Sequence, residues 1–309
     1  MSQVLDPTTP VSSTPNPEGG LDIQGSEGIS NRLNGSASDD LISTATLDEV
    51  LAGVVGGTLP GALGTNDVID AGEGDDVVFG LGGDDSILGS QGNDLVIANQ
   101  GDDTVDGGEG SDEIFAGQGD DSIDGGEDSD LISGDLGNDV VSGGSGDDAI
   151  YGGQGIDNLF GGDGNDLILG GQGDDVISGD AGNDVMAGDR GNDTITGGDG
   201  SDRFVFGGVF NSTVVELGVD SITDFSVGED KISLSQFTFT EIGDSLTAAE
   251  FSTTAAFDSN ADGASAAKII YDSTTGLIYY NPTEAVGDEV VFAQVDPNLA
   301  LDEDSFEVF

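Results

Sequence analysis

The sequence predicts an all-β protein built from a stacked repeat. A nine-residue period runs from Ala71 to Val205 without insertion or deletion and divides this stretch into fifteen nonapeptides. The eighth position of every nonapeptide is apolar, and glycine contributes 54 of the 309 residues. Units of this kind bury their apolar residues by stacking on their neighbours. A flexible Gly/Asp linker would need neither a fixed phase nor an apolar ladder.

Charge and missing residue types narrow the possible functions. The chain has 62 Asp and Glu against 5 Lys and Arg, a formal net charge of -57, so we expect no binding to nucleic acid or anionic lipid. It has no His and no Cys, which excludes zinc fingers, Ser-His-Asp or Cys-His nucleophiles and disulfides. Oxygen ligands remain, and these suit calcium or magnesium. The sequence has no apolar run of about 18 residues, so we predict no membrane span.

The columns of the repeat show which positions are fixed. The sixth residue is Asp in all fifteen nonapeptides, and the fourth is Gly in all but one, where Asp128 stands. The first is always Gly or Ala, and the second admits Asn, Asp, Ser and Leu besides Gly. Most of these second-position residues tolerate positive φ, which indicates a tight turn.

The pattern G-G-x-G-x-D-x-U-x, as in Gly170-Gly-Gln-Gly-Asp-Asp-Val-Ile-Ser178, resembles the nonapeptide of the RTX (repeats-in-toxin) family of secreted calcium-binding proteins. The resemblance implies a parallel β-roll in which GGxGxD is a calcium-loaded turn and xUx a short strand. Two successive nonapeptides then complete one coil of the roll. We assign residues 71–205 to this β-roll.

Simple geometry agrees with that fold. Stacked strands lie about 4.8 Å apart, and calcium binds oxygen at about 2.4 Å, so one ion fits between carboxylates that are two nonapeptides apart. Turn carbonyls can complete the shell, and roughly a dozen calcium ions are expected. The predicted carboxylate ligands are Asp76, Asp85, Asp94, Asp103, Asp112, Asp121, Asp130, Asp139, Asp148, Asp157, Asp166, Asp175, Asp184, Asp193 and Asp202. The predicted glycines of the metal-binding turns are Gly74, Gly83, Gly92, Gly101, Gly110, Gly119, Gly137, Gly146, Gly155, Gly164, Gly173, Gly182, Gly191 and Gly200.

Without metal these carboxylates would repel one another. Two of them about 5 Å apart at an effective dielectric constant of about 20 repel by roughly 3 kcal/mol. Summed over thirteen facing gaps in the array, this exceeds the stability of an ordinary domain, about 5 to 15 kcal/mol. The sequence therefore predicts an array that is disordered without calcium and folds when calcium binds. Irregular nonapeptides, such as those with Asp128 or Ile156, could instead be spacers without metal.

The N-terminal part divides in two. Residues 1–34 are rich in Pro, Ser, Thr and Asn, which predicts a disordered tail without a classical secretory signal. Residues 35–70 contain two degenerate nonapeptides with Asp40 and Asp67 at the key position, and we expect an N-terminal cap or worn repeats. Residues 44–61 fit a short capping helix or two further degenerate coils equally well.

Residues 206–309 have a different composition and predict a β-rich C-terminal cap. Strands are expected at 220–225, 231–235, 268–271 and 277–280, with a hairpin turn at 273–276. Residues 201–237 resemble the segment that closes β-rolls in RTX proteins, and the rest resembles the C-terminal region of cyanobacterial RTX-type proteins. The resemblance implies export by the type I secretion machinery through an uncleaved C-terminal signal. An ordinary last strand is the alternative for that terminus.

Two further patterns carry less weight. Asp258-Ser-Asn-Ala-Asp-Gly263 matches the opening of an EF-hand loop, but Ile269 stands where the bidentate Glu belongs, so a simple acidic loop is favoured. Gly143-Gly-Ser-Gly146 lies in a turn, and no His is present to activate Ser145. We therefore expect no catalytic residues and no enzyme activity.

The sequence thus favours a calcium-binding protein that is secreted or held at the cell surface, with a structural or adhesive role. The alternative is a carbohydrate-binding or enzyme-accessory module, with cell-surface polysaccharide as the partner. An ice-binding roll would need a flat Thr ladder, but the ninth positions begin Phe79, Leu88, Ile97, Asp106, Phe115.

Overall fold

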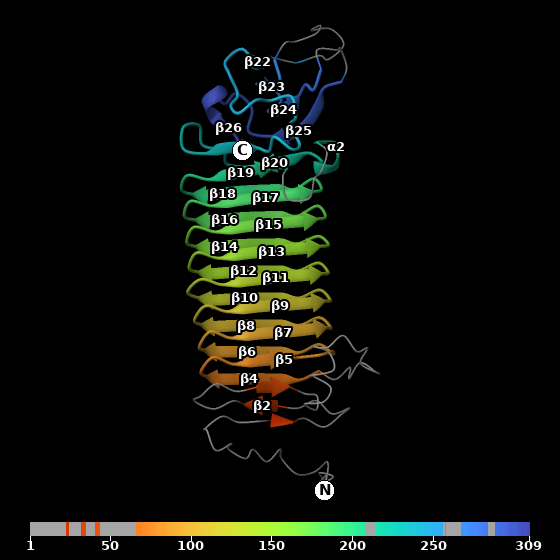
Figure 1. Ribbon diagram of the computed structural model, residues 1–309, viewed down its shortest axis with the longest axis vertical. Helices are drawn as coiled ribbons and strands as arrows, with labels where there is room; N and C mark the ends of the chain where they lie inside the picture. Colours follow the sequence, from red (N-terminus) through yellow and green to blue (C-terminus); the bar gives the residue numbers. More distant parts are fainter. Residues whose placement is uncertain are drawn as a thin grey trace.

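Two β-sheets run side by side along one long axis and form a roll, in which all strand pairs are parallel except β23–β24 and β24–β25 (Figure 1). The computed structural model describes residues 66–207, 214–255, 257, 267–283 and 288–309, together with the backbone of three short strands between residues 23 and 43. The tail, the EF-hand-like segment and residues 44–61 otherwise lie outside the described residues. No helix in the described part of the chain is long and apolar enough to cross a membrane.

From β1 to β21, successive strands alternate between the two sheets. Sheet 1 contains, in spatial order, β1 (Ile23–Gln24), β3 (Leu41–Ser43), β5 (Val77–Phe79), β7 (Leu95–Gln100), β9 (Glu113–Gln118), β11 (Leu131–Leu136), β13 (Ala149–Gln154), β15 (Leu167–Gln172), β17 (Val185–Arg190), β19 (Arg203–Phe206), β21 (Lys231–Leu234) and β26 (Phe306–Val308). Sheet 2 contains β2 (Arg32–Asn34), β4 (Val68–Glu73), β6 (Ser86–Gln91), β8 (Thr104–Glu109), β10 (Ser122–Glu127), β12 (Val140–Ser145), β14 (Asn158–Asp163), β16 (Val176–Ala181), β18 (Thr194–Asp199), β20 (Asp220–Ile222), β25 (Val290–Gln294), β24 (Leu277–Tyr280), β23 (Ile269–Asp272) and β22 (Phe251–Thr254).

The predicted coil of two nonapeptides is confirmed by the strand registers. Ile132 on β11 aligns with Ile114 on β9 and with Ile150 on β13, each of them two nonapeptides away along the chain. The eighth-position side chains of the array form two internal ladders, and all of them are at most 3% exposed. One apolar residue per nonapeptide is enough to fill the interior because the roll is only two strands thick.

The strands are longer than the sequence predicts. In most coils they cover six residues, from the seventh position of one nonapeptide to the third of the next, in place of the three expected. Positions two and three also align with the neighbouring coil, as Asp135 does with Gly117 and Leu136 with Gln118. The turn is therefore reduced to positions four to six. A positive φ at the second position, such as 109° at Gly117 and 70° at Asp135, bends each strand at the corner.

The stack continues into part of the chain where the sequence predicts an unpaired tail. β1 and β2 lie within residues 1–34, and β2 pairs with β4 so that Leu33 aligns with Ile69. Leu33 and Ile42 occupy the same register position as the eighth-position residues Ile69 and Val78. β3 pairs directly with β5, and Ile42 aligns with Val78 although four nonapeptide lengths of chain separate them in place of two. No described strand pair includes a residue from 44–61.

The C-terminal region closes the other end of the roll. β20 and β21 extend the two sheets, and β23 and β24 form an antiparallel hairpin whose turn ends at Gly276, with φ 80°. These elements confirm the predicted strands and hairpin turn. A short helix, α2 (Val214–Leu217), and a 3-10 helix, η1 (Glu303–Ser305), complete the region. Figure 1 shows it seated on the end of the stack.

Candidate metal centre

The sixth-position Asp side chains point into the turns and form two continuous ladders. All fifteen are at most 4% exposed. In each ladder the backbone N–H of one Asp donates to Oδ1 of the Asp one coil later, as Asp121 does to Asp139 and Asp139 to Asp157, both at 2.8 Å. The carboxylates are therefore held in place by the backbone of the preceding coil, and every coil orients the next.

The second carboxylate oxygen is the unusual feature of the site. From Asp85 to Asp202, Oδ2 of every ladder Asp is buried and has no hydrogen-bond partner in the described part of the chain. A buried polar atom without a partner costs on the order of 1 to 3 kcal/mol. Fourteen such atoms in register, all of one kind, indicate a site for a group that the protein itself does not supply.

Backbone carbonyls face the same space. A Cβ added to Gly143 would lie 2.3 Å from Oδ2 of Asp148 and 2.6 Å from the carbonyl oxygen of Gly161 on the next coil. Gly125 and Gly161 have equivalent surroundings, with Oδ2 at 2.4 and 2.3 Å respectively. The glycine at position one thus leaves a small space in which a carboxylate oxygen and a carbonyl oxygen converge.

The fourth-position glycines have the conformation that the turn requires. All fourteen predicted glycines have positive φ, from 112° at Gly83 to 152° at Gly191 and Gly200. A Cβ on Gly155 would lie 1.5 Å from the carbonyl oxygen of Gly137, one coil earlier. Asp128, the exception, keeps a positive φ of 73°. The turn geometry therefore continues through the irregular repeat.

The electrostatics of the ladder favour a bound cation. Burial, together with the neighbouring carboxylates, raises the pKa of Asp121 and Asp130 to about 7, although the backbone N–H of the preceding coil opposes the shift. The same causes raise the pKa of Asp139 to about 6. Near neutral pH these sites bind positive charge, either as protons or as a metal ion.

The donor set fits a hard cation coordinated largely by backbone. No group of three or more acidic side chains converges in the described part of the chain. Each interval between coils instead offers two ladder carboxylates and carbonyl oxygens from the glycine turns. Oxygen-only coordination that mixes carboxylate and carbonyl ligands is typical of calcium.

The ladders extend beyond the residues predicted from the repeat. At the C-terminal end, Asp193 donates its N–H to Oδ1 of Asp220 at 3.2 Å, and Asp202 donates to Oδ1 of Asp230 at 3.0 Å. At the other end, Asp67 donates to Asp85 at 2.8 Å. Gly218-Val-Asp-Ser-Ile222 and Gly228-Glu-Asp-Lys-Ile232 retain the G-x-D-x-U part of the motif, and both glycines have positive φ, 82° and 93°. That remnant could have revealed both residues.

A second, exposed ladder lies beside the first. Fifth-position side chains accept N–H groups from the next coil, as Asp147 accepts from Asn165 and Asn165 from Asn183. The two hydrogen bonds from Asn165 lower the pKa of Asp147. Ile156, at the same position, donates its N–H to Asn138 but carries no side-chain acceptor. This ladder provides hydrogen-bond acceptors for the backbone N–H groups of the turns. It gives a structural role to many acidic residues that are not among the predicted metal ligands.

The fold and site together define a β-roll protein with a repeating oxygen-lined centre for a hard cation. Comparison with known families agrees: the model of the RTX calcium-binding nonapeptide repeat matches residues 62–96, 88–123, 97–132, 124–159, 151–186 and 178–211. Residues 62–211 therefore belong to the RTX family of calcium-binding nonapeptide repeats. No curated protein matches the chain. Proteins with these repeats bind calcium and are typically secreted. The β-roll that the repeats form is typically structural rather than catalytic.

Proposed function

We propose that this chain is an extracellular calcium-binding protein that folds on calcium binding after export and has a structural or adhesive role at the cell surface. The carrying observation is the register of buried, unpartnered Oδ2 atoms from Asp85 to Asp202. In a calcium-poor cytoplasm the ladder carboxylates oppose stacking, and the chain stays open. Where calcium is plentiful the ions link successive coils, and binding energy becomes folding energy.

The metal ligands proposed are the fifteen sixth-position Asp carboxylates with carbonyl oxygens of the glycine turns. Calcium would supply positive charge at each interval between coils. The chain's own residues would position the ligands: backbone N–H groups orient the carboxylates, and the glycines allow the carbonyl oxygens to approach the carboxylate oxygens. We propose no catalytic residue, because the buried carboxylates have a structural arrangement that repeats without variation along the roll.

A calcium titration by calorimetry, followed in parallel by far-UV circular dichroism, tests this function. We expect about a dozen ions bound and a transition from disordered chain to β-structure. Fewer than four bound ions would refute the site as assigned. An identical far-UV spectrum in excess chelator and in millimolar calcium would refute folding on calcium binding.

Export through a type I system is the second part of the proposal. In the folded chain the terminal segment is a strand: β26 pairs with β21, Phe306 is buried, and Arg203 Nε lies 2.5 Å from Glu307 Oε1. A signal read before folding is compatible with a strand formed afterwards. Deleting residues 290–309 should abolish export to the medium, and unchanged export would refute the signal.

A further inference from the structure

The two outer faces of the roll differ in charge. On sheet 2, third-position residues include Glu73, Glu109, Glu127, Asp163 and Asp199, and ninth-position residues include Asp70, Asp106 and Asp124. On sheet 1, between Val77 and Arg190, neither position carries an acid. In a chain with a net charge of -57, a face whose two outer ladders carry no acid needs an explanation, although Glu113 at a seventh position and Asp135 at a second position are exposed on the same sheet.

The two outer ladders of that face are of a different kind. The ninth positions of sheet 1 place Phe79, Ile97, Phe115, Tyr151 and Leu169 along the roll, all half-buried. The third positions place Gln100, Gln118, Gln154 and Gln172 parallel to them, all exposed. Within the described part of the chain, none of these four side-chain amides forms a hydrogen bond. On sheet 2, by contrast, the amide of Gln91 donates to Glu109 at 3.1 Å.

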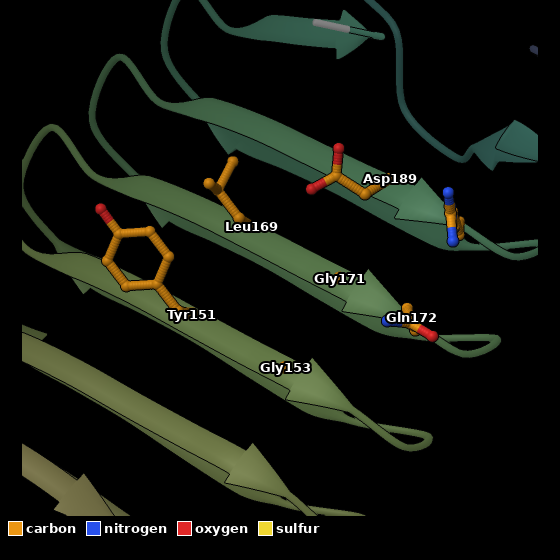
Figure 2. A pocket seen from close by; sticks show the side chains of 7 residues that line it. Tyr151, Gly153, Leu169, Gly171, Gln172 and Asp189 are labelled. Atoms are coloured by element: carbon orange, nitrogen blue, oxygen red, sulfur yellow. The ribbon is translucent and has the colours of Figure 1, made fainter. Parts of the chain in front are cut away.

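A groove runs between the two ladders, and second-position residues form its floor: Gly117, Gly153 and Gly171, with Asp135 between the first two. Two adjoining recesses of about 620 and 370 Å³ follow one another along sheet 1, and both include Gly153 and Gln172 in their linings. Figure 2 shows Tyr151 and Leu169 on neighbouring strands, Gly153 and Gly171 further along the same strands, and Gln172 at a strand end. The groove is long and open, and its pattern of an apolar ninth residue and a third-position Gln recurs on β7, β9, β13 and β15. On β11 it is interrupted by Ser133, Asp135 and Leu136.

The chemistry of the groove suits hydroxyl-rich, uncharged rings. Aromatic and aliphatic side chains offer apolar faces for stacking, and free amides both donate and accept hydrogen bonds to hydroxyl groups. Coils repeat about every 4.8 Å, so equivalent contacts recur at regular steps, as required by a linear polymer of similar units. An anionic polymer would be repelled by the rest of the chain, and a cationic one would favour the acidic face of sheet 2.

We propose that this groove on sheet 1 binds an extended neutral polysaccharide lying along the axis of the roll. The proposal rests on the calcium-dependent function proposed above, because the ladders exist only in the folded roll. The groove ends at Asp189 and Arg190 on β17, where a buried carboxylate and a guanidinium replace the small floor residue and the Gln. Charged hydrogen-bonding groups therefore mark one end of the binding surface.

Affinity electrophoresis in millimolar calcium tests the proposal. Native gels would contain a neutral polymer (β-glucan, mannan, arabinoxylan or dextran), an anionic one (alginate or pectate) or a cationic one (chitosan). At least one neutral polymer should retard the wild-type protein. The double variant Phe115→Ala/Tyr151→Ala should bind that polymer at least tenfold more weakly, and Gln154→Glu should weaken binding severalfold.

Phe160→Ala is the matched control, because Phe160 is a ninth-position aromatic residue on the acidic face, 37% exposed. It should bind within twofold of wild type. The proposal is overturned by retardation in no neutral polymer, by stronger retardation in an anionic one, by retardation in chitosan that the double variant weakens as much as it weakens neutral-polymer binding, or by an equal loss in Phe160→Ala. It is also overturned in favour of self-association if wild type is a dimer by light scattering and the double variant a monomer.

Calorimetric calcium binding of the same variants separates this inference from the proposed function. Normal calcium stoichiometry without polysaccharide binding would remove only the groove proposal. Loss of calcium binding by the wild-type array would remove the function on which it rests.

Discussion

The repeat array and the C-terminal region reach similar β-structure with opposite interiors. Each coil of the array buries two apolar side chains and two carboxylates, so burial and repulsion are interleaved along its whole length. The C-terminal region has a compact aromatic core, in which the ring of Phe292 lies 5.1 Å from that of Phe206 and 5.0 Å from that of Phe239. The first interior is the one that we propose calcium stabilises, and the second resembles an ordinary domain core.

Calcium removal should therefore unfold the repeat array and leave the C-terminal region folded, and this is the largest effect that we expect. In excess chelator the amides of residues 71–205 should lose nearly all protection from hydrogen exchange, because the buried carboxylates repel. Amides of β23 and β24 should stay protected. Mass-spectrometric exchange of peptides from both regions measures this directly, and simultaneous loss of protection in both would break the comparison.

Acidification should stabilise the calcium-free array, which is the opposite of the effect of calcium removal. Burial raises the pKa of ladder residues such as Asp85 and Asp175 to about 7 in the folded roll, above the ordinary value of 3.8. Their contribution to stability is complete below pH about 4 and is lost as pH rises through about 7. Without calcium, the array should gain β-structure between pH 8 and pH 5.

With calcium the sign reverses, since protons compete with the ion for the same oxygens. Calcium affinity should fall as pH drops below about 7, and circular dichroism with a calcium electrode measures both effects. A calcium-free spectrum that does not change with pH would show that carboxylate repulsion is not what keeps the array open.

A single added methyl group tests the close stacking of the turns. Gly155→Ala places Cβ 1.5 Å from the carbonyl of Gly137 at φ 143°. We expect the calcium-loaded array to lose about 2 kcal/mol or more of unfolding free energy. Gly228→Ala is the control, because φ is also positive, 93°, but no atom lies within 4 Å. Thermal unfolding measures the stability of both variants. If both lose the same stability, the cause is the positive φ alone and not the close contact with the neighbouring coil.

Removing one carboxylate charge from the ladder should change the stability of the array least. The change should be a loss of stability with calcium and a gain without it. Asp139→Asn removes a carboxylate that lies between Asp121 and Asp157. In calcium we expect about one or two ions fewer and a lower melting temperature, and in chelator slightly less disorder, because repulsion falls. Asp124→Asn on the outer face should change neither. A lower stability in both conditions would contradict the electrostatic explanation.

The repeat made most of this architecture predictable. Period, apolar eighth residue and fixed Asp led to the roll, to the internal ladders and to the alignment of Asp residues two nonapeptides apart, whereas the burial of residues such as Asp139 was not predicted. The Asp220 and Asp230 ends of the ladders were not predicted because the nine-residue period stops at Val205. Asp220 lies 27 residues after Asp193 and Asp230 lies 28 residues after Asp202, in place of the 18 that separate partners within the array. The six-residue strands were missed because glycines at the corner resemble a turn.

The contrast between the outer faces was missed for another reason. Read consecutively, the ninth positions alternate Phe79, Leu88, Ile97, Asp106 and Phe115 without a clear pattern. Read at every second nonapeptide, they separate into an apolar ladder and a largely polar one. The pattern was present in the sequence, but only the assignment of alternate strands to two sheets shows which period to use.

The alternation of strands also restricts how such a protein can change in length. Each coil contacts only its neighbours, so gaining or losing a pair of nonapeptides leaves every kind of contact in place. Gaining or losing a single nonapeptide would exchange the sheets for all later strands, and Tyr151 would move to the acidic side while Glu127 would move to the neutral one. Insertions and deletions inherited in this array should therefore come in even numbers of nonapeptides wherever the two faces serve different purposes.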